Sequence, residues 1–162
     1  MRSLQMQWLL APKSGVFQMR EVLLDTDILS EVLKGRDPEV MRNAKNYLSL
    51  FGRLTISSVT ITEVVKGFQL TRDERRLQSF LESLENNETL PLGISEAALA
   101  GRIMGDLIRK GIPIGHMDPL IAATAIVHDL PLVTGNTKHF NRIIELGYPL
   151  QLQNWREALP NG

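Results

Sequence analysis

Short apolar runs alternate with segments of helical periodicity along most of this chain, and this alternation limits its fold more than any other feature. The apolar runs that predict strands cover residues 21–25, 54–57, 89–92, 130–134 and 150–152. Helical spacing of apolar residues follows the first strand up to about residue 35 and covers 38–50, 59–70, 71–84, 95–110 and 119–128. Strands that alternate with helices of these lengths predict a parallel sheet with helical crossovers.

The expected fold class is therefore α/β, a doubly wound and mainly parallel sheet flanked by helices. The chain has 162 residues, of which 43% are hydrophobic, which is enough for one buried core but not for two ordinary domains. We place the folded domain at 19–156, between an extension or purification remnant at 1–18 and a C-terminal tail at 157–162. Within the domain, Ser95 is the expected N-cap of the 95–110 helix.

The composition excludes several kinds of chemistry. The chain lacks cysteine, so it has no disulfide, no thiolate metal site and no cysteine nucleophile. Any metal ion must be bound by oxygen or imidazole. Without a secretion signal or an apolar run long enough to span a membrane, the protein is expected to be soluble and cytoplasmic, with no membrane partner.

The charge balance requires any nucleic-acid binding to rest on a local surface. Eighteen basic and eighteen acidic residues cancel, so there is no global positive field. Two groups of cations offer such a surface: Lys66, Arg72, Arg75 and Arg76 near one helix junction, and Arg102, Arg109 and Lys110 on another helix. Acidic residues nearby also fit an ordinary solvated surface, and contact with phosphate is the alternative.

Three acidic residues occupy places where such a fold binds ligands. Asp25 ends the first strand, Glu63 is expected in the first turn after the second strand, and Asp118 is expected to open the helix before the fourth. Because ligands of doubly wound sheets bind beyond the carboxyl ends of the strands, these side chains are able to converge. Converging carboxylates repel one another unless a divalent cation neutralises them, and hard oxygen ligands select Mg²⁺ or Mn²⁺. The pattern favours metal-dependent hydrolysis of a phosphodiester.

Each of these acids also has an ordinary structural explanation. Residues 60–63, Thr-Ile-Thr-Glu, fit a capping box, and Asp118 followed by Pro119 fits an N-cap with proline at the first helical position. Asp25 or Asp27 is able to cap the next helix. Capping alone does not explain why the first acid directly ends the most apolar strand.

At these acids the sequence resembles PIN-domain proteins. Residues 23–30, Leu-Leu-Asp-Thr-Asp-Ile-Leu-Ser, look like the opening of that family. Three further blocks resemble the family's later motifs in the same order: 56–63 ending in Glu63, 115–123 containing Asp118, and 132–140 containing Asn136. The resemblance covers about residues 19–156, and its ending at 152–155 is similar to the tails of VapC-type toxins from VapBC toxin–antitoxin pairs.

This resemblance implies a function and a set of site residues. Asp25, Glu63 and Asp118 would bind Mg²⁺ or Mn²⁺, and Asn136 would complete the catalytic set. The activity would be hydrolytic cleavage of RNA by a metal-dependent endoribonuclease. The expected partners are an RNA substrate, a VapB-like antitoxin that covers the site, and a second copy in a homodimer.

The sequence departs from the family pattern at three positions near the site. Asp27 stands where asparagine is common, and His139 and His116 stand where many relatives carry an acid. Two alternatives remain. One is a catalytically weakened PIN fold that binds RNA or protein. The other is a haloacid-dehalogenase-type phosphatase, which the Asp25-Thr-Asp27 run resembles but the following Ile28 does not.

Overall fold

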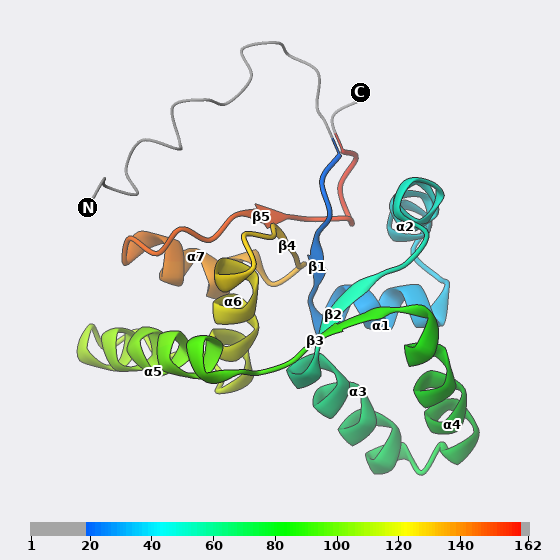
Figure 1. Ribbon diagram of the computed structural model, residues 1–162, viewed down its shortest axis with the longest axis horizontal. Coiled ribbons are helices and arrows are strands. Elements are labelled where there is room, and N and C mark those ends of the chain that lie inside the picture. The colour runs from blue at the N-terminus through cyan, green and yellow to red at the C-terminus, as the bar shows by residue number, and fades with distance from the viewer. Residues whose placement is uncertain (1–18, 160–162) are drawn as a thin grey trace.

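The strands form one parallel sheet at the centre of the computed structural model, which describes residues 19–159 (Figure 1). The strands are β1 (Leu23–Leu24), β2 (Thr55–Ser57), β3 (Glu88–Leu90), β4 (Leu132–Val133) and β5 (Leu152–Gln153). Their order in the sheet is β3-β2-β1-β4-β5, and every neighbouring pair is parallel. The predicted fold class is confirmed.

Helices cover both faces of this sheet (Figure 1). They are α1 (Thr26–Lys34), α2 (Pro38–Phe51), α3 (Ser58–Thr71), α4 (Glu74–Ser83), α5 (Ile94–Arg109), α6 (Met117–Val127) and α7 (Thr137–Glu145), with one 3₁₀ turn at Leu84–Asn86. One hydrophobic core joins the sheet to α1, α2, α3 and α4. A second core joins it to α5, α6 and α7.

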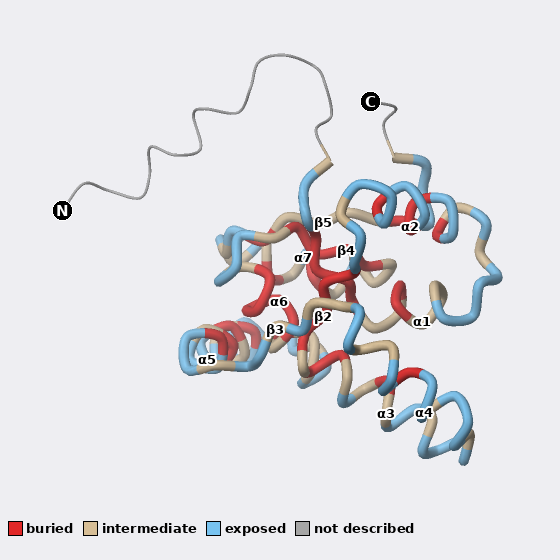
Figure 2. Tube along the Cα trace, turned by 45° about the vertical axis from the view of Figure 1, so that its right-hand side comes forward, coloured by how far each residue is buried: buried red, intermediate tan, exposed pale blue. Residues whose placement is uncertain are grey.

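The sequence of the strands explains why there are two cores. Leu23 and Leu24 are both fully buried, but Leu23 belongs to the core under α6 and Leu24 to the core under α1. Leu132 and Val133 divide in the same way. Successive side chains of a strand point to opposite faces, so a strand covered on both sides must be apolar throughout. Figure 2 shows the buried residues at the centre and exposed surfaces on the outer sides of the helices.

The strand order reverses between β1 and β4, and we call the region at the carboxyl ends of these two strands the crevice. The chain runs from β1 outward through β2 to β3, and then returns to the other side of β1 to form β4 and β5. The two connections beside β1 and β4 therefore leave in opposite directions. In doubly wound folds, ligands bind at the carboxyl ends of the two strands where the order reverses.

Several local predictions differ from the structure. The helix α7 was not predicted from its pattern, because only Phe140 and Ile143 of its nine residues are buried. The N-cap of α5 is Gly93, so the prediction of Ser95 as the cap was wrong. The predicted 71–84 helix begins at Glu74, because Arg72 ends α3 in the left-handed region with φ of 54°.

The C-terminal end of the described chain is held by packing. Trp155 is 1% exposed and lies 5.5 Å from Tyr47 between ring centroids. Asn43 donates its side-chain amide to the carbonyl oxygens of Trp155 and Glu157.

Within residues 19–159, none of the helices is long and apolar enough to cross a membrane.

Candidate functional site

Asp25 lies in the crevice between β1 and β4. It directly follows β1, it is 5% exposed, and it is the N-cap of α1. Its Oδ1 accepts the backbone N–H of Thr26 at 2.7 Å, and its Oδ2 accepts the hydroxyl of Thr134, which follows β4, at 2.8 Å. The predicted capping role is confirmed, but capping uses only one of the two carboxylate oxygens. The other oxygen connects the ends of the two central strands.

Glu63 reaches the same crevice from α3. Its carboxylate accepts a hydrogen bond from the hydroxyl of Thr26, one residue after Asp25. The predicted capping box is wrong, because the N-cap of α3 is Ser57, whose hydroxyl accepts the backbone N–H of Thr60 at 3.0 Å. Glu63 lies in the second turn of the helix, where its carboxylate has no capping role.

Asp118 enters from α6, on the other side of the crevice. It lies inside the first turn of the helix, and His116 occupies the N-cap position without a side-chain capping bond. The prediction that Asp118 caps this helix was therefore wrong. The Asp118 carboxylate is directed at the beginning of α7, where its Oδ2 lies 3.0 Å from Nδ1 of His139.

Burial and neighbouring acids raise the pKa of Asp25 and of Asp118. Burial raises the pKa of Asp25 to about 7, and the negative charges of Asp27 and, to a smaller extent, Asp118 add to this rise. The hydrogen bonds from Thr134 and Thr26 act in the opposite direction. At neutral pH the protein therefore holds this buried carboxyl close to the point where it gains or loses a proton.

The pKa of Asp118 is also raised, mainly because the carboxyl is removed from water. The hydrogen bond and the charge of His139 lower it, and the charges of Glu63 and Asp27 raise it again. These charge effects show that Asp25, Asp27, Glu63 and Asp118 lie in one region, although they come from a strand end and three different helices. Such a region has a deficit of positive charge.

Asn136 lies beside Asp118 and His139. It occupies the N-cap position of α7, but its side chain makes no capping hydrogen bond there. Its side-chain amide nitrogen lies 3.5 Å from Oδ2 of Asp118 and 2.9 Å from Nδ1 of His139. The structure thus brings Asn136 and Asp118 together, as the sequence resemblance implied.

Asp27, like Asp25, accepts hydrogen bonds on both carboxylate oxygens. Its Oδ1 accepts the backbone N–H of Ile28 and its Oδ2 accepts that of Gly135, at 2.7 and 2.8 Å. A carboxylate that accepts backbone hydrogen bonds on both oxygens is suited to holding the loop after β4 in place, and not to releasing a proton as a general acid. This arrangement does not fit the phosphatase alternative.

Three residues that hold the crevice together were not identified from the sequence. Thr134 is fully buried, donates to Asp25 and accepts the backbone N–H of Asn136 at 3.0 Å. Thr26 donates to Glu63, and Gly135 donates to Asp27. The sequence offers only weak indications of the two threonines: Thr26 directly follows Asp25, and Thr134 directly follows β4, two residues before Asn136.

A groove extends from the acids along the helices α1, α3 and α4. Its volume is about 380 Å³, and it begins at Thr26 and Glu63. Farther along, its walls are mainly apolar and include Leu33, Phe68 and Phe80. The groove therefore has an acidic end at Glu63 and a mainly apolar surface along the rest of its length.

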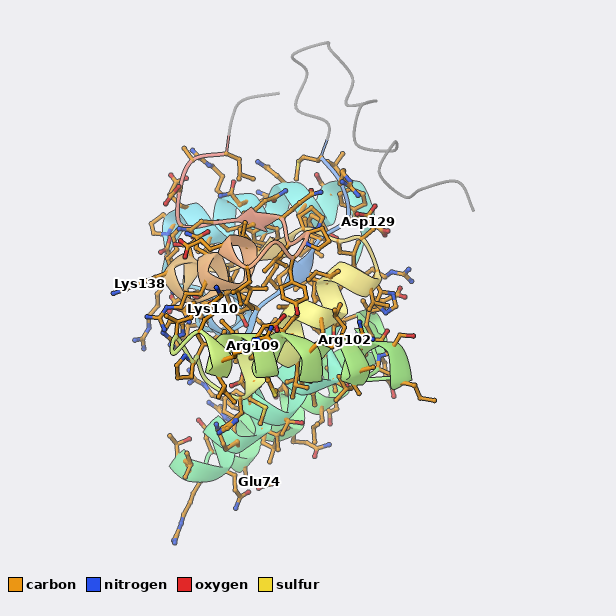
Figure 3. All side chains as sticks on the ribbon, turned by 90° about the vertical axis from the view of Figure 1, so that its left-hand side faces the viewer. Glu74, Arg102, Arg109, Lys110, Asp129 and Lys138 are labelled. Atoms are coloured by element: carbon orange, nitrogen blue, oxygen red, sulfur yellow. The ribbon has the colours of Figure 1, made fainter. Side chains whose placement is uncertain are left out.

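The predicted cations lie on the outer surface. Figure 3 shows Arg102, Arg109 and Lys110 along α5, and Lys138 at the start of α7, on the same side of the molecule. Arg109 forms an exposed ion pair with Asp106 at 2.5 Å, and such a pair contributes little to stability. Lys138 is one residue from His139, so this side of the molecule reaches the edge of the acidic crevice.

The side chains at the crevice fit a hard divalent cation by their chemistry. They offer carboxylate oxygens, one amide oxygen and one imidazole nitrogen, and the raised pKa of Asp25 and Asp118 reflects missing positive charge. Among residues 19–159, no three histidine or acidic side chains stand together as a complete cation site. Hydroxyl, amide and imidazole groups hold the carboxylates instead, and these contacts are exchangeable for a cation.

Comparison with known proteins agrees with this geometry. Residues 22–146 match the PIN domain. The chain is 33% identical to "Ribonuclease VapC" of Rickettsia bellii over 77% of this chain and 92% of the relative, and 31% identical to "tRNA(fMet)-specific endonuclease VapC" of Shigella flexneri over 77% and 93%.

Solved structures show the same fold. A chain in the crystal structure of VapBC2 from Rickettsia felis, bound to a DNA fragment from their promoter, superposes with a TM-score of 0.70 and 28% identity. The superposition covers 84% of this chain and 99% of the other. Because both the sequence match and the sheet with its crevice of acids extend over most of the molecule, this chain belongs to the PIN-domain family.

Proposed function

We propose that this protein is an endoribonuclease that hydrolyses RNA phosphodiester bonds with the help of Mg²⁺ or Mn²⁺. The observation that carries the proposal is the convergence of Asp25, Glu63 and Asp118 at the point where the strand order reverses. The names of the relatives, ribonuclease and endonuclease VapC, support RNA as the substrate.

The chain's own residues have separable roles in this reaction. Asp25, Glu63 and Asp118 would hold the cation, and Asn136 would orient Asp118 and the substrate beside it. Thr134 and Thr26 fix the directions of the Asp25 and Glu63 carboxylates. A bound divalent cation supplies positive charge to the scissile phosphate and lowers the pKa of the attacking water.

No side chain at the crevice is needed as a nucleophile. Asp25 is buried and hydrogen-bonded on both oxygens, so it is not placed for attack on phosphorus. Water is therefore the proposed nucleophile, and cleavage proceeds without a covalent enzyme intermediate. Exposed cations such as Lys138 and Arg102 would contact the RNA backbone, and this binding would weaken as the salt concentration rises.

The biological role we infer is that of a toxin in a type II toxin–antitoxin pair, acting on RNA in the cytoplasm. The relatives named VapC and the superposition on a VapBC2 structure support a VapB-like antitoxin as partner. The groove between α1, α3 and α4 is the surface we assign to it, because the groove is continuous with the acids at Thr26 and Glu63. A homodimer remains a prediction of the resemblance.

The antitoxin segment that fits this groove has apolar side chains and a basic residue. Leu33, Phe68 and Phe80 provide apolar contacts, and Glu63 provides a carboxylate for a guanidinium or ammonium group. A basic side chain at that end would place a positive charge where the cation is needed, and would compete with it. Binding of the antitoxin would then itself inhibit RNA cleavage.

Expression in bacteria tests the toxin role. We expect the wild-type protein to arrest growth when it is expressed without its antitoxin, and co-expression of the antitoxin to restore growth. Asp25→Ala should relieve the arrest at the same level of soluble protein. If the variant and the wild type arrest growth equally, the effect does not come from cleavage at these acids.

A further inference from the structure

His139 makes two polar contacts with a single ring nitrogen. Its Nδ1 lies 3.0 Å from Oδ2 of Asp118 and 2.9 Å from the side-chain amide nitrogen of Asn136. The Asp118 oxygen and the Asn136 nitrogen are themselves 3.5 Å apart. The three atoms form a small triangle at the edge of the acidic crevice, between the first turn of α6 and the beginning of α7.

While the amide nitrogen of Asn136 faces the ring, no arrangement of protons satisfies all three contacts. An imidazole nitrogen has either one proton or one lone pair, directed along one line in the ring plane. If Nδ1 of His139 has a lone pair, it accepts a hydrogen bond from the Asn136 amide but faces the lone pairs of the Asp118 carboxylate. If Nδ1 has a proton, it donates to Asp118 but faces the N–H groups of Asn136. If Asp118 is protonated and Nδ1 is not, two donors face the single lone pair of Nδ1.

Turning the amide group of Asn136 makes all three groups possible ligands. The oxygen and nitrogen of an amide side chain are interchangeable by rotation, so Oδ1 is able to face the ring. A proton on Nδ1 of His139 would then be shared between the two oxygens. With the ring proton on Nε2 instead, the Asp118 oxygen, the Asn136 oxygen and Nδ1 all present lone pairs to one point.

The spacing of these atoms fits a metal ion at that point. Adjacent ligands of an octahedral ion with bonds of about 2.1 Å lie about 3 Å apart. The contacts of 2.9, 3.0 and 3.5 Å are close to this separation. No third histidine or acid is required, because the amide oxygen of Asn136 completes the face.

We propose that Asp118, Asn136 and His139 form one face of the divalent-cation site, with His139 binding the cation through Nδ1. This inference deepens the proposed nuclease function and rests on it. A ligand set that contains an imidazole nitrogen favours Mn²⁺ over Mg²⁺, because Mg²⁺ binds mainly oxygen and Mn²⁺ accepts nitrogen more readily. Asp25 and Glu63 add negative charge near Asp118.

Pulsed electron paramagnetic resonance of the protein loaded with Mn²⁺ alone tests this assignment. We expect ¹⁴N coupling to the Mn²⁺ in the wild type, and ¹⁵N coupling when histidine is labelled with ¹⁵N. His139→Gln should remove the histidine coupling and weaken Mn²⁺ binding by about ten- to a hundredfold. His139→Glu should lack the coupling but bind Mg²⁺ more tightly than the wild type does.

His116→Gln is the matched control, because His116 is exposed and lies two residues before Asp118. This variant should keep the coupling, and circular dichroism should show that all variants are folded. A wild type that binds Mn²⁺ without histidine coupling overturns the role of His139 but leaves the proposed nuclease intact. A wild type that cleaves no RNA with either metal overturns the proposed function itself.

Discussion

At the scale of single residues, the site depends on carboxyl groups that the fold holds in an unfavourable charged state. Asp25 is buried, and its neighbours Asp27 and Asp118 are also acidic, so its pKa rises to about 7. Hydrogen bonds from Thr134 and Thr26 offset part of this effect. Capping of α1 and the contact with Thr134 give Asp25 a structural role, but a buried acid with a strongly raised pKa beside other acids is typical of functional sites.

The raised pKa of Asp25 predicts a pH-dependent stability without metal. Between about pH 4 and pH 7 the folded protein keeps a proton on Asp25 that the unfolded chain has released. Stability contributed by this protonated group is therefore lost as the pH rises through about 7. Asp25→Asn carries no charge to bury, so its advantage over the wild type should grow with pH and reach roughly 4 kcal/mol at pH 8.

Urea unfolding at pH 5 and pH 8 in the presence of a chelator measures this difference. Asp129→Asn is the control, since Asp129 is exposed and distant from the crevice. A stability difference between Asp25→Asn and the wild type that does not change with pH would contradict a raised pKa of Asp25. Added Mn²⁺ should stabilise the wild type more than Asp25→Asn.

The sequence identifies the acids of the candidate site better than the residues that hydrogen-bond to them. Asp25 directly follows the most apolar strand, where a charged residue stands out. Glu63 and Asp118 are recognisable from their motif blocks, although Glu63 lies one turn later in its helix than expected and Asp118 does not open its helix. His139 is indicated only by its departure from the family pattern, and Thr134 carries no comparable indication, because a threonine after a strand is common in proteins of many kinds. Their roles depend on distances across the chain, such as the contact between Thr134 and Asp25, 109 residues apart.

At the scale of structural elements, the loop between β4 and α7 determines how closely the acids approach. Thr134, Gly135 and Asn136 contact Asp25, Asp27 and Asp118 in turn. The sequence predicts β4 from its apolar residues but does not predict α7, whose helical pattern is short and mostly polar. The apolar residues Phe140 and Ile143 are buried at helical spacing, so the pattern of α7 is amphipathic but too short to stand out, and its first residues lie beside Asp118 through Asn136 and His139.

A substitution of Gly135 tests whether the loop between β4 and α7 positions Asp27. A Cβ atom at Gly135 would lie 2.6 Å from Oδ2 of Asp27 and 2.9 Å from Nε of Arg156. We expect Gly135→Ala to displace Asp27, lower stability by roughly 1–3 kcal/mol, and reduce RNA cleavage. Gly115→Ala is the control, since a Cβ there has nothing within 4 Å.

Denaturant unfolding of both glycine variants measures the effect. Gly115→Ala should stay within about 0.5 kcal/mol of the wild type. An equally small change for Gly135→Ala would show that the loop accommodates a side chain beside Asp27.

At the scale of the whole molecule, the order β3-β2-β1-β4-β5 places the acids and the groove at one end of the sheet. The alternation of apolar runs and helical segments predicts this doubly wound architecture, because few other folds accommodate it. It does not predict the groove, whose walls come from α1, α3 and α4 and depend on how these helices are spaced. The antitoxin surface is therefore a property of the assembled domain.

Leu33 tests the antitoxin surface. It lines the groove and is 43% exposed, although it is a large apolar residue. Leu33→Arg would place a charge on the apolar floor, and we expect it to weaken antitoxin binding at least about tenfold. Leu48→Arg on α2 is the control, because Leu48 is similarly exposed and does not line the groove. Equal antitoxin affinity of the two variants in a titration would remove the groove from the interface.

RNA cleavage by purified Asp118→Asn tests the central claim most directly. Asparagine keeps the size of the side chain but removes the charge that the cation requires, so the fold should be retained and cleavage abolished. We expect the wild type to cleave RNA with Mn²⁺ or Mg²⁺, to lose activity with a chelator, and to be faster with Mn²⁺ at equal concentration. Full activity of a well-purified Asp118→Asn, or undiminished wild-type activity in the chelator, would contradict a metal-dependent nuclease built on these acids.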